Sequence, residues 1–382
     1  MTPTDRPLHR LLLRASLSIA QLFAWIFVFQ YFYFHSSSFE SAAVSFALTY
    51  ALTQVITILF APIAAMGLRH GYRGRMVFAV LMLATAYGTM AFALANTAFS
   101  FGSAIAFFAI LIGLYRAFYW TPYSIAARTN SGARHTSWEY LLAFLPLIGG
   151  FFLQQNTGAP ATLLVIAAIL ALLSLVPLLS MRDAHEGFSW GYRETFHQLF
   201  VSAHRRMTLS SILHGAEISI LLIVWPIIVF VILGWSYALL GIVMSFIYVL
   251  SIPISGMIRR SAMMLSAPTR ALLAASAWIM RLSVTGSVGV ILIDTYYFGG
   301  SNAPSRGLDM ITGEHAADNT TYVDEYTVLK EISMAMGRLI MALIVAILAS
   351  NMSVTYDFSI VFALAAIAAA GGIFLSAKSA RL

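Results

Sequence analysis

The chain of 382 residues is 60% hydrophobic and only 10% charged, so it has more apolar surface than a water-soluble core of this size could hide. Its apolar stretches are continuous, which excludes a β-barrel, whose strands alternate polar and apolar residues. It has no cysteine, which excludes disulfides and thiolate metal sites, and its net charge of +7 comes from basic residues in short loops, where they set orientation rather than bind nucleic acid.

Apolar stretches of about 20 residues, the length that crosses a bilayer as a helix, follow one another along almost the whole chain. They predict an all-α, polytopic membrane protein with twelve transmembrane helices at 11–34, 41–66, 76–97, 101–127, 138–156, 160–181, 207–233, 236–256, 267–285, 287–310, 325–350 and 355–377. The first run extends past Phe34, too far for the apolar core of a signal peptide, so we expect it to be retained. The segment 267–310 is the least regular, because Asp294 and Arg306 interrupt its apolar pattern.

The lysines and arginines test independently whether the number of spans is even, because cytoplasmic loops of membrane proteins carry these residues in excess. The predicted outer connections contain none of the 22 basic residues. An odd number of spans would break this pattern. We therefore predict that both termini are cytoplasmic and that the protein lies in the plasma (inner) membrane.

The longest connection between spans, 182–206, divides the chain into two halves of six spans each. We expect an N-terminal bundle over 1–181 and a C-terminal bundle over 207–382. Within the connection, aromatic residues such as Phe188 and Trp190 are interleaved with charged ones, a pattern typical of a helix lying in the membrane interface. A simple tether between the halves is the alternative.

Two six-span halves, a long cytoplasmic linker and a basic loop after the second span together resemble the major facilitator superfamily. In that family the loop reads Gly, three variable residues, Asp, Arg, a variable residue, Gly, Arg and a further basic residue. Here Gly67, Gly74 and Arg75 match the pattern, while Gly71 and Tyr72 replace the Asp and the first Arg.

A second motif, in the fifth span of the family's proton-driven exporters, ends Gly-Pro-x-x-Gly-Gly. The fifth span of this chain has Pro146, Gly149 and Gly150, with Leu145 in place of the first Gly. The match is partial, and a glycine-rich helix could produce it for packing reasons alone.

The resemblance implies transport by alternating access, in which two helical bundles rock around a site near the middle of the membrane. Spans 1, 4, 7 and 10 would line the cavity, and spans 3, 6, 9 and 12 would face lipid. In the loop after span 2, Arg73 and Arg75 would be structural or gating charges.

Ionisable side chains within spans are costly unless they meet water or a partner, so their positions report where a cavity lies. Spans 4, 7 and 10 contain Arg116, Glu217 and Asp294, and span 1 contains Gln21, whereas spans 3, 6 and 12 have no charge at their centres. This distribution matches the cavity that the resemblance implies. We expect Arg116, Glu217 and Asp294 to converge on one central space between the halves.

Span 4 carries the predicted substrate-binding face, to which Gln21 of span 1 would add. Arg116, Tyr119, Trp120 and Tyr123 follow a spacing of three to four residues, which places them on one side of a helix. A guanidinium among aromatic rings suits an anionic headgroup, a carboxylate or a flat ligand. A structural ion pair of Arg116 in an aromatic core is the alternative.

Glu217 and Asp294 are the predicted proton-coupling residues, because a carboxyl group held away from water retains its proton more readily. His214 lies three residues before Glu217, on the same face, and could relay the proton. If His214 instead lies near the cytoplasmic interface, it is only a hydrated end residue. We favour Glu217 over Asp294, because Asp294 has more arginines within reach.

The remaining intramembrane charges, Arg281, Arg306, Glu331 and Arg338, are assigned structural or gating roles. Arg281 is expected to pair with an acid from span 10 or 11. Glu331 and Arg338 lie two helical turns apart, roughly 10 Å, which is too far for direct contact, so each needs another partner or water.

No pattern indicates an enzyme, a metal site or a cofactor. The run Gly187 to Gly191 spells a nucleophile elbow but has no strand before it, and there is neither a paired-histidine zinc motif nor a phosphate loop. We predict a monomeric, proton-coupled secondary transporter whose partners are the lipid bilayer, protons and a small-molecule substrate. Export of an amphipathic or lipid-like compound is favoured. A uniporter, an importer of a small polar solute, and a receptor or assembly partner that does not transport are the alternatives.

Overall fold

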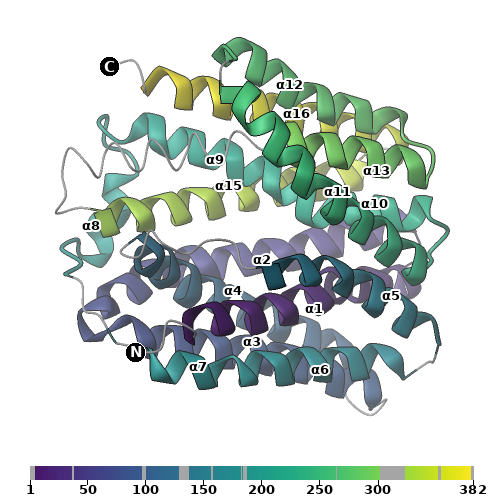
Figure 1. Ribbon diagram of the computed structural model, residues 1–382, viewed down its shortest axis with the longest axis horizontal. Coiled ribbons are helices and arrows are strands. Elements are labelled where there is room, and N and C mark those ends of the chain that lie inside the picture. Colours follow the sequence, from purple (N-terminus) through teal and green to yellow (C-terminus); the bar gives the residue numbers. More distant parts are fainter. Residues whose placement is uncertain are drawn as a thin grey trace.

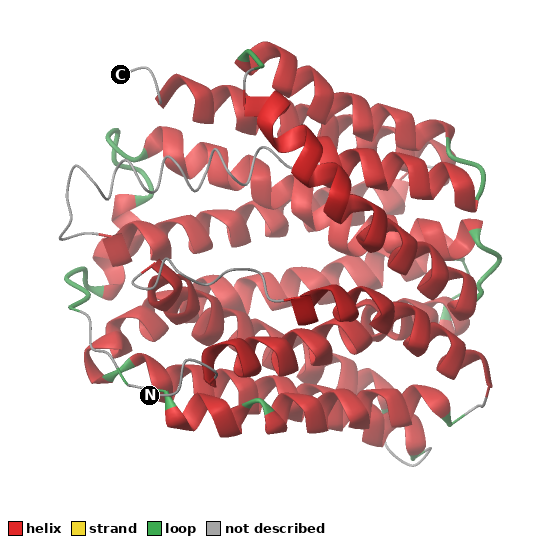
Figure 2. Cartoon of the chain, in the orientation of Figure 1, coloured by secondary structure: helices red, strands yellow, loops and turns green. Residues whose placement is uncertain are grey.

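The computed structural model of the chain describes residues 5–36, 38–96, 100–128, 137–155, 158–181, 183, 187–263, 265–301, 323–351 and 354–379. Every regular element in these ranges is a helix (Figure 2). Nine helices within them are long and apolar enough to cross a membrane. The prediction of an all-α polytopic membrane protein is confirmed.

Among the described residues, the N-terminal half has six helical segments at the predicted places. They are α1 (Asp5–His35), α2 (Phe39–Met66), α3 (Tyr72–Ala95), α4 (Phe101–Arg128), the pair η2 (Ser137–Phe144) and α5 (Leu145–Gln155), and the pair α6 (Ala159–Leu173) and α7 (Leu175–Ser180). Proline explains the breaks in the last two segments. Pro146 and Pro177 lie in the first turns of α5 and α7, where the missing N–H of proline is tolerated.

The C-terminal half also has six helical segments within the described ranges. They are α9 (Arg205–Ser219) with η3 (Ile220–Val224) and α10 (Trp225–Ile232), α11 (Tyr237–Met263), α12 (Ala267–Met280) with η4 (Arg281–Ser283), α13 (Ser287–Tyr296) with η5 (Tyr297–Ser301), α15 (Val323–Asn351) and α16 (Val354–Ser379). Pro226 follows the π-helical turn η3, because its ring does not fit a regular helical ladder. The irregular segment 267–310 begins as two helices, and its residues 302–310, with Arg306, lie outside the described residues.

The two halves lie side by side, with α1 to α7 in one layer and α9 to α16 in the other (Figure 1). Two helix pairs form the seam between them, α2 against α15 and α5 against α11. A Cβ atom on Gly150 would overlap the carbonyl oxygen of Tyr237, and one on Gly241 would overlap that of Pro146. The backbones of α5 and α11 therefore touch, and Gly150 of the partial exporter motif is one of the residues that permit it.

The outer surface of the bundle is apolar along the helices that the resemblance assigns to lipid. On α6, Val165, Ile169 and Leu173 are exposed, and on α16 Ile367 and Phe374 are exposed. A helix with apolar residues on its exposed side needs lipid or another apolar partner. The exposed surface of α6 and α16 thus fits the predicted contact with lipid.

The described part of the linker packs against both halves. Its short helix α8 (Tyr192–Gln198) places the Tyr192 hydroxyl where it donates to the carbonyl oxygen of Leu59 on α2, at 3.3 Å. Just before α8, the backbone N–H and the hydroxyl of Ser189 donate to Oε1 of Glu325 on α15, at 2.8 and 2.7 Å. The linker therefore bridges α2 and α15 at one end of the seam.

Candidate functional site

A cavity of about 370 Å³ lies between the two halves, and we call it the central cavity. Its wall combines α1 to α4 with α9, η3 and α15. The lining residues are Leu17, Gln21, Trp25, Thr57, Leu83, Tyr87, Phe108, Ile112, Tyr115, Arg116, Trp120, Ile218, Leu222, Glu331, Met334 and Arg338. The charged side chains are therefore two arginines and one glutamate, surrounded largely by aromatic and aliphatic groups.

Arg116 extends from α4 toward the cavity and has only neutral partners among the described residues. Its Nη1 donates to the Tyr50 hydroxyl at 3.4 Å, and its Cζ lies 5.9 Å from the centre of the Tyr50 ring. Its nearest aromatic partner therefore comes from α2 rather than from α4.

Of the aromatic face predicted on α4, only Trp120 lines the central cavity together with Arg116. Tyr119 is buried against α1, where its hydroxyl lies 3.2 Å from Nε2 of His9, and its ring stacks on those of Tyr115 and Tyr123. Tyr123 does not line the cavity. Steps of four residues from Arg116 toward the N-terminus reach Ile112 and Phe108, which do line it.

Arg338 and Glu331 enter the same cavity from α15. Arg338 is 9% exposed, and its Nε has no hydrogen-bond partner among the described residues. No acid of the described chain lies within 4.0 Å of its guanidinium, and Glu331 likewise forms no ion pair with a described residue. The two side chains remain separate, as their spacing along α15 predicts.

A second cavity of about 200 Å³, which we call the side cavity, lies next to the central one. Leu17, Gln21 and Leu222 line both cavities, so the two adjoin. The other lining residues of the side cavity are Ser18, Leu22, Pro146, Leu221, Trp225, Pro226, Met244, Ile247, Tyr248, Asp294 and Phe298. Asp294 is the one acidic group among these described lining residues.

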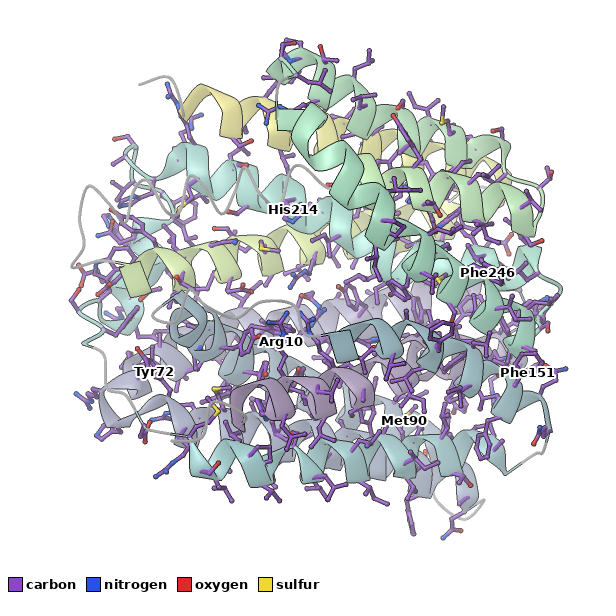
Figure 3. All side chains as sticks on the ribbon, viewed as in Figure 1. Arg10, Tyr72, Met90, Phe151, His214 and Phe246 are labelled. Atoms are coloured by element: carbon purple, nitrogen blue, oxygen red, sulfur yellow. The ribbon has the colours of Figure 1, made fainter. Side chains whose placement is uncertain are left out.

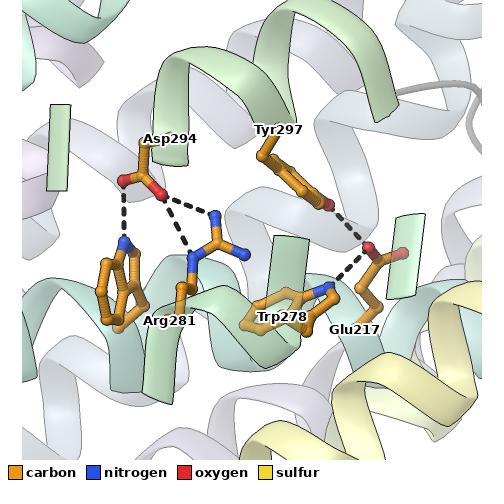
Figure 4. Close-up of polar contacts among 6 residues, drawn as sticks. Glu217, Trp278, Arg281, Asp294 and Tyr297 are labelled. Carbon is orange, nitrogen blue, oxygen red and sulfur yellow. Dashed lines mark hydrogen bonds and ion pairs between the residues drawn. The ribbon is translucent and has the colours of Figure 1, made fainter. Parts of the chain in front are cut away.

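Asp294 forms a buried ion pair with Arg281, as expected for that arginine (Figure 4). Nη2 and Nε of Arg281 donate to Oδ1 of Asp294 at 2.6 and 3.1 Å. The indole N–H of Trp225 donates to the second oxygen, Oδ2, at 2.7 Å. Both oxygens of Asp294 are therefore hydrogen-bonded.

The Arg281 guanidinium is also enclosed by aromatic rings. Its Cζ lies 4.2 Å from the ring centre of Trp278, 4.7 Å from that of Tyr297 and 5.1 Å from that of Trp225. The negative faces of such rings stabilise a cation. Together with Asp294 and Glu217, these residues form a unit that we call the charge cluster.

Glu217 is fully buried on the far side of the same rings (Figure 4). Its Oε1 accepts from the Trp278 indole N–H at 3.0 Å and from the Tyr297 hydroxyl at 2.8 Å. Its Oε2 has no hydrogen-bond partner among the described residues and lies 3.6 Å from Nδ1 of His214. His214 is itself buried within the C-terminal half (Figure 3), so it is not a hydrated end residue.

The three charges expected to share one space are distributed over three places in this conformation. Arg116 lines the central cavity and Asp294 the side cavity, whereas Glu217 lines neither. Glu217 occupies the face of α9 that points to α12 and η5, and the next residue, Ile218, is the one that reaches the central cavity.

The loop after α2 uses a carboxylate from elsewhere in the chain. The Arg73 backbone N–H donates to Oδ1 of Asp183, which follows α7, at 3.0 Å, and the Arg73 guanidinium donates to the Leu179 carbonyl at 3.1 Å. Gly71 has a φ of 105°, and a Cβ there would overlap the Asp183 carboxylate. Asp183 thus brings a carboxylate to the loop after α2, in which Gly71 stands at the position of the aspartate in the motif. The guanidinium of Arg75 packs on Gly67.

No protein-family model matches the chain, and no curated protein matches it. Solved structures do match over nearly its whole length. A D-xylose-proton symporter is 12% identical with a TM-score of 0.64, covering 94% of each chain. The human organic anion transporter MFSD10 is 14% identical with a TM-score of 0.60, covering 98% of this chain and 100% of its own. The Escherichia coli fucose:proton symporter is 13% identical with a TM-score of 0.58, covering 97% and 96%.

At these identities the likeness establishes the fold and not the cargo. The two six-helix halves, the seam and the matched structures agree with the resemblance found in the motifs. The chain is a multi-pass membrane protein with the fold of the major facilitator superfamily of secondary transporters.

Proposed function

We propose that the protein is a secondary transporter that works by alternating access, with its cargo bound in the central cavity. One observation carries the proposal: this cavity lies on the seam and takes its wall from both halves. If the halves rock about the seam, the same residues face first one side of the membrane and then the other.

Side-chain contacts between the halves at both ends of the seam support this motion. At one end the Tyr237 hydroxyl donates to Oε1 of Gln30, and the ring of Trp235 lies 4.9 Å from that of Tyr33. At the other end the linker joins α2 to α15 through Tyr192 and Ser189. Contacts of this kind can break at one end while they hold at the other.

The charge cluster supports coupling to protons. It contains two carboxyl groups, Glu217 and Asp294, and one guanidinium, Arg281. With both carboxyls ionised, a buried site would hold an uncompensated negative charge, which is costly. One proton balances the cluster. We assign proton coupling to Glu217, because Asp294 is paired with Arg281 whereas the hydrogen-bond donors to Glu217 are the neutral Trp278 and Tyr297.

The helix that carries Glu217 also contributes to the cavity wall. Ile218 follows it directly, and Leu222 lies one turn further, within the π-helical turn η3. Such turns are common at functional sites, because they interrupt the regular ladder of a helix. A movement of α9 and η3 that reshapes the central cavity would therefore change the surroundings of Glu217. This link couples protonation to cargo binding.

The lining of the central cavity favours an amphipathic organic cargo over a sugar-like solute. Five aromatic side chains, Trp25, Tyr87, Phe108, Tyr115 and Trp120, face it, whereas its neutral polar groups without a ring are Gln21 and Thr57. Export in exchange for protons is the direction that the partial exporter motif indicates, and Gly150 of that motif also permits the close packing of α5 on α11. A uniporter would have the same cavity but no response to a pH gradient.

For orientation we propose cytoplasmic termini in the plasma (inner) membrane, as the basic loops indicate. The cysteine-free chain makes this simple to test with single substitutions at exposed positions. Arg69→Cys and Ser202→Cys should be protected from an impermeant maleimide in intact cells, whereas Ser103→Cys and Ser350→Cys should react. The reverse pattern would invert the topology.

Alternating access is tested at Leu222, which lines both cavities and is 42% exposed. Leu222→Cys should react with an impermeant maleimide in right-side-out vesicles and also in inside-out vesicles. Ile367→Cys, on the apolar outer face of α16, is the matched control and should react in neither. Reaction of Leu222→Cys from one side only, under every condition of pH, would contradict the proposal.

A further inference from the structure

The central cavity holds two arginines that come from opposite halves. Arg116 belongs to α4 and Arg338 to α15, and both line the same space of about 370 Å³. Among the described residues, neither guanidinium has an acid within 4.0 Å. Within the described parts of the chain, the partner of Arg116 is the neutral hydroxyl of Tyr50, and the Nε of the 91% buried Arg338 has no hydrogen-bond partner.

Two like charges across an apolar cavity raise the energy of the empty protein, because the surroundings screen them poorly. Glu331 lines the cavity as well and can offset only one of the two charges. The described lining of the cavity therefore has a surplus of one positive charge.

Arg281 of the same chain shows, for comparison, how an arginine with a structural role is held. Arg281 has a carboxylate on two of its nitrogens and three aromatic rings around it. No described residue offers Arg116 or Arg338 such a carboxylate. Guanidinium groups bind carboxylates and phosphates through paired N–H donors, so an anion from outside the chain would supply what the protein does not.

We propose that the cargo is an organic anion whose carboxylate or phosphate binds between Arg116 and Arg338, while its apolar part lies against the aromatic wall. This inference rests on the proposed transport function and specifies the cargo class. The cavity volume suits a small organic molecule. Trp25, Tyr87, Phe108 and Trp120 provide flat apolar surface next to the two charges.

The arrangement also gives the anion a mechanical effect. In the empty protein the two arginines repel each other across the seam, which favours separation of α4 from α15. A bound anion attracts both and draws the halves together. Closure around the cargo would then be driven by the cargo's own charge, because an anion between the two groups interacts more strongly with the closed form than with the open one.

Calorimetric titration of the purified protein in detergent tests the inference. The probes are 2-naphthoate, naphthalene-2-sulfonate and phenyl phosphate, with 2-naphthamide and 2-naphthylmethylamine as neutral and cationic counterparts. One or more of the three anions should bind, with an affinity about tenfold or more above that of 2-naphthamide. Arg116→Gln and Arg338→Gln should each weaken that binding at least about tenfold, and the exposed Arg69→Gln should leave it unchanged.

Two results would overturn the inference: none of the three anions binds, or the amide binds as tightly as the best anion. The experiments distinguish an error in the proposed cargo class from an error in the proposed transport function. If Leu222→Cys still reacts from both sides of the membrane while no anion binds, the protein alternates but carries something else. If the anions bind and Leu222→Cys reacts from one side only, the site is real and the transport proposal is wrong.

Discussion

The charge cluster and the central cavity both place arginine among aromatic rings, but they treat its charge differently. In the charge cluster Arg281 is bonded to Asp294 through two nitrogens and enclosed by three rings (Figure 4). In the central cavity Arg116 and Arg338 have no acidic partner among the described residues. Removing the partner of a buried, paired charge destabilises the fold, whereas a buried charge without an acidic partner is available to water or to a ligand.

Asp294→Asn should give the largest effect, because it leaves the Arg281 guanidinium buried without an anion. We expect a loss of about 3–5 kcal/mol in the free energy of unfolding, seen as a much lower unfolding temperature in detergent. The double variant Arg281→Met with Asp294→Leu removes both charges and should recover most of the loss. Normal stability of Asp294→Asn would mean that the pair is not structural.

Gly337→Ala tests the contact between α9 and α15. This contact joins the charge cluster to the central cavity, because α9 carries Glu217 and α15 carries Arg338. A Cβ on Gly337 would overlap the carbonyl oxygen of Ile212 on α9, so the helices must separate, at about 1–3 kcal/mol. Gly289→Ala is the matched control. Its Cβ would have only an ordinary contact, 3.5 Å from Val284, and its thermal stability should not fall.

Glu217→Gln should change stability by less than about 1 kcal/mol, because the amide oxygen can keep the hydrogen bonds from Trp278 and Tyr297. Its effect appears in coupling instead. We take the rate at which Leu222→Cys reacts with maleimide relative to the rate of the exposed Ser103→Cys at the same pH, because the reactivity of any thiol rises with pH. This ratio should depend on pH in the parent protein and lose that dependence with Glu217→Gln. His214→Gln, combined with Leu222→Cys in the same way, distinguishes the contribution of the histidine to the pH dependence from that of the carboxyl group. An unchanged pH profile in Glu217→Gln would remove it as the proton carrier.

Arg338→Gln should have the smallest effect on stability, and of the opposite sign to a change at Arg281. Removing one of two like charges relieves repulsion, so the unfolding free energy should stay level or rise by up to about 1 kcal/mol. Arg281→Gln, measured beside it, should be strongly destabilising. A comparable loss in both variants would show that Arg338 has a structural partner.

The sequence predicts what depends on local signals. Span length, apolar composition and loop charge give all twelve segments, and the short connection between α12 and α13 brings Arg281 close enough to Asp294 for the expected pair. Proline positions likewise account for the breaks at Pro146 and Pro226.

What the sequence does not predict is how each helix is rotated in the bundle. A spacing of three to four residues places Arg116 and Tyr119 on one side of α4, but only the packing decides that Tyr119 turns to α1 and Ile112 to the cavity. The same holds for Glu217, which points to Trp278 rather than inward. Asp183 could not be assigned to the loop after α2 either, because it lies far along the chain.

The most direct test of the account measures the two ends of the seam at once, by electron-electron double resonance between spin labels. One cysteine pair, Arg69→Cys with Thr269→Cys, reports on the end that carries the linker, and Ser103→Cys with Ser350→Cys reports on the opposite end. In lipid nanodiscs, a change of pH, or addition of an anion that binds in the calorimetric titration, should lengthen the distance within one spin-label pair and shorten the distance within the other. Distances that stay fixed, or that lengthen together, would contradict alternating access.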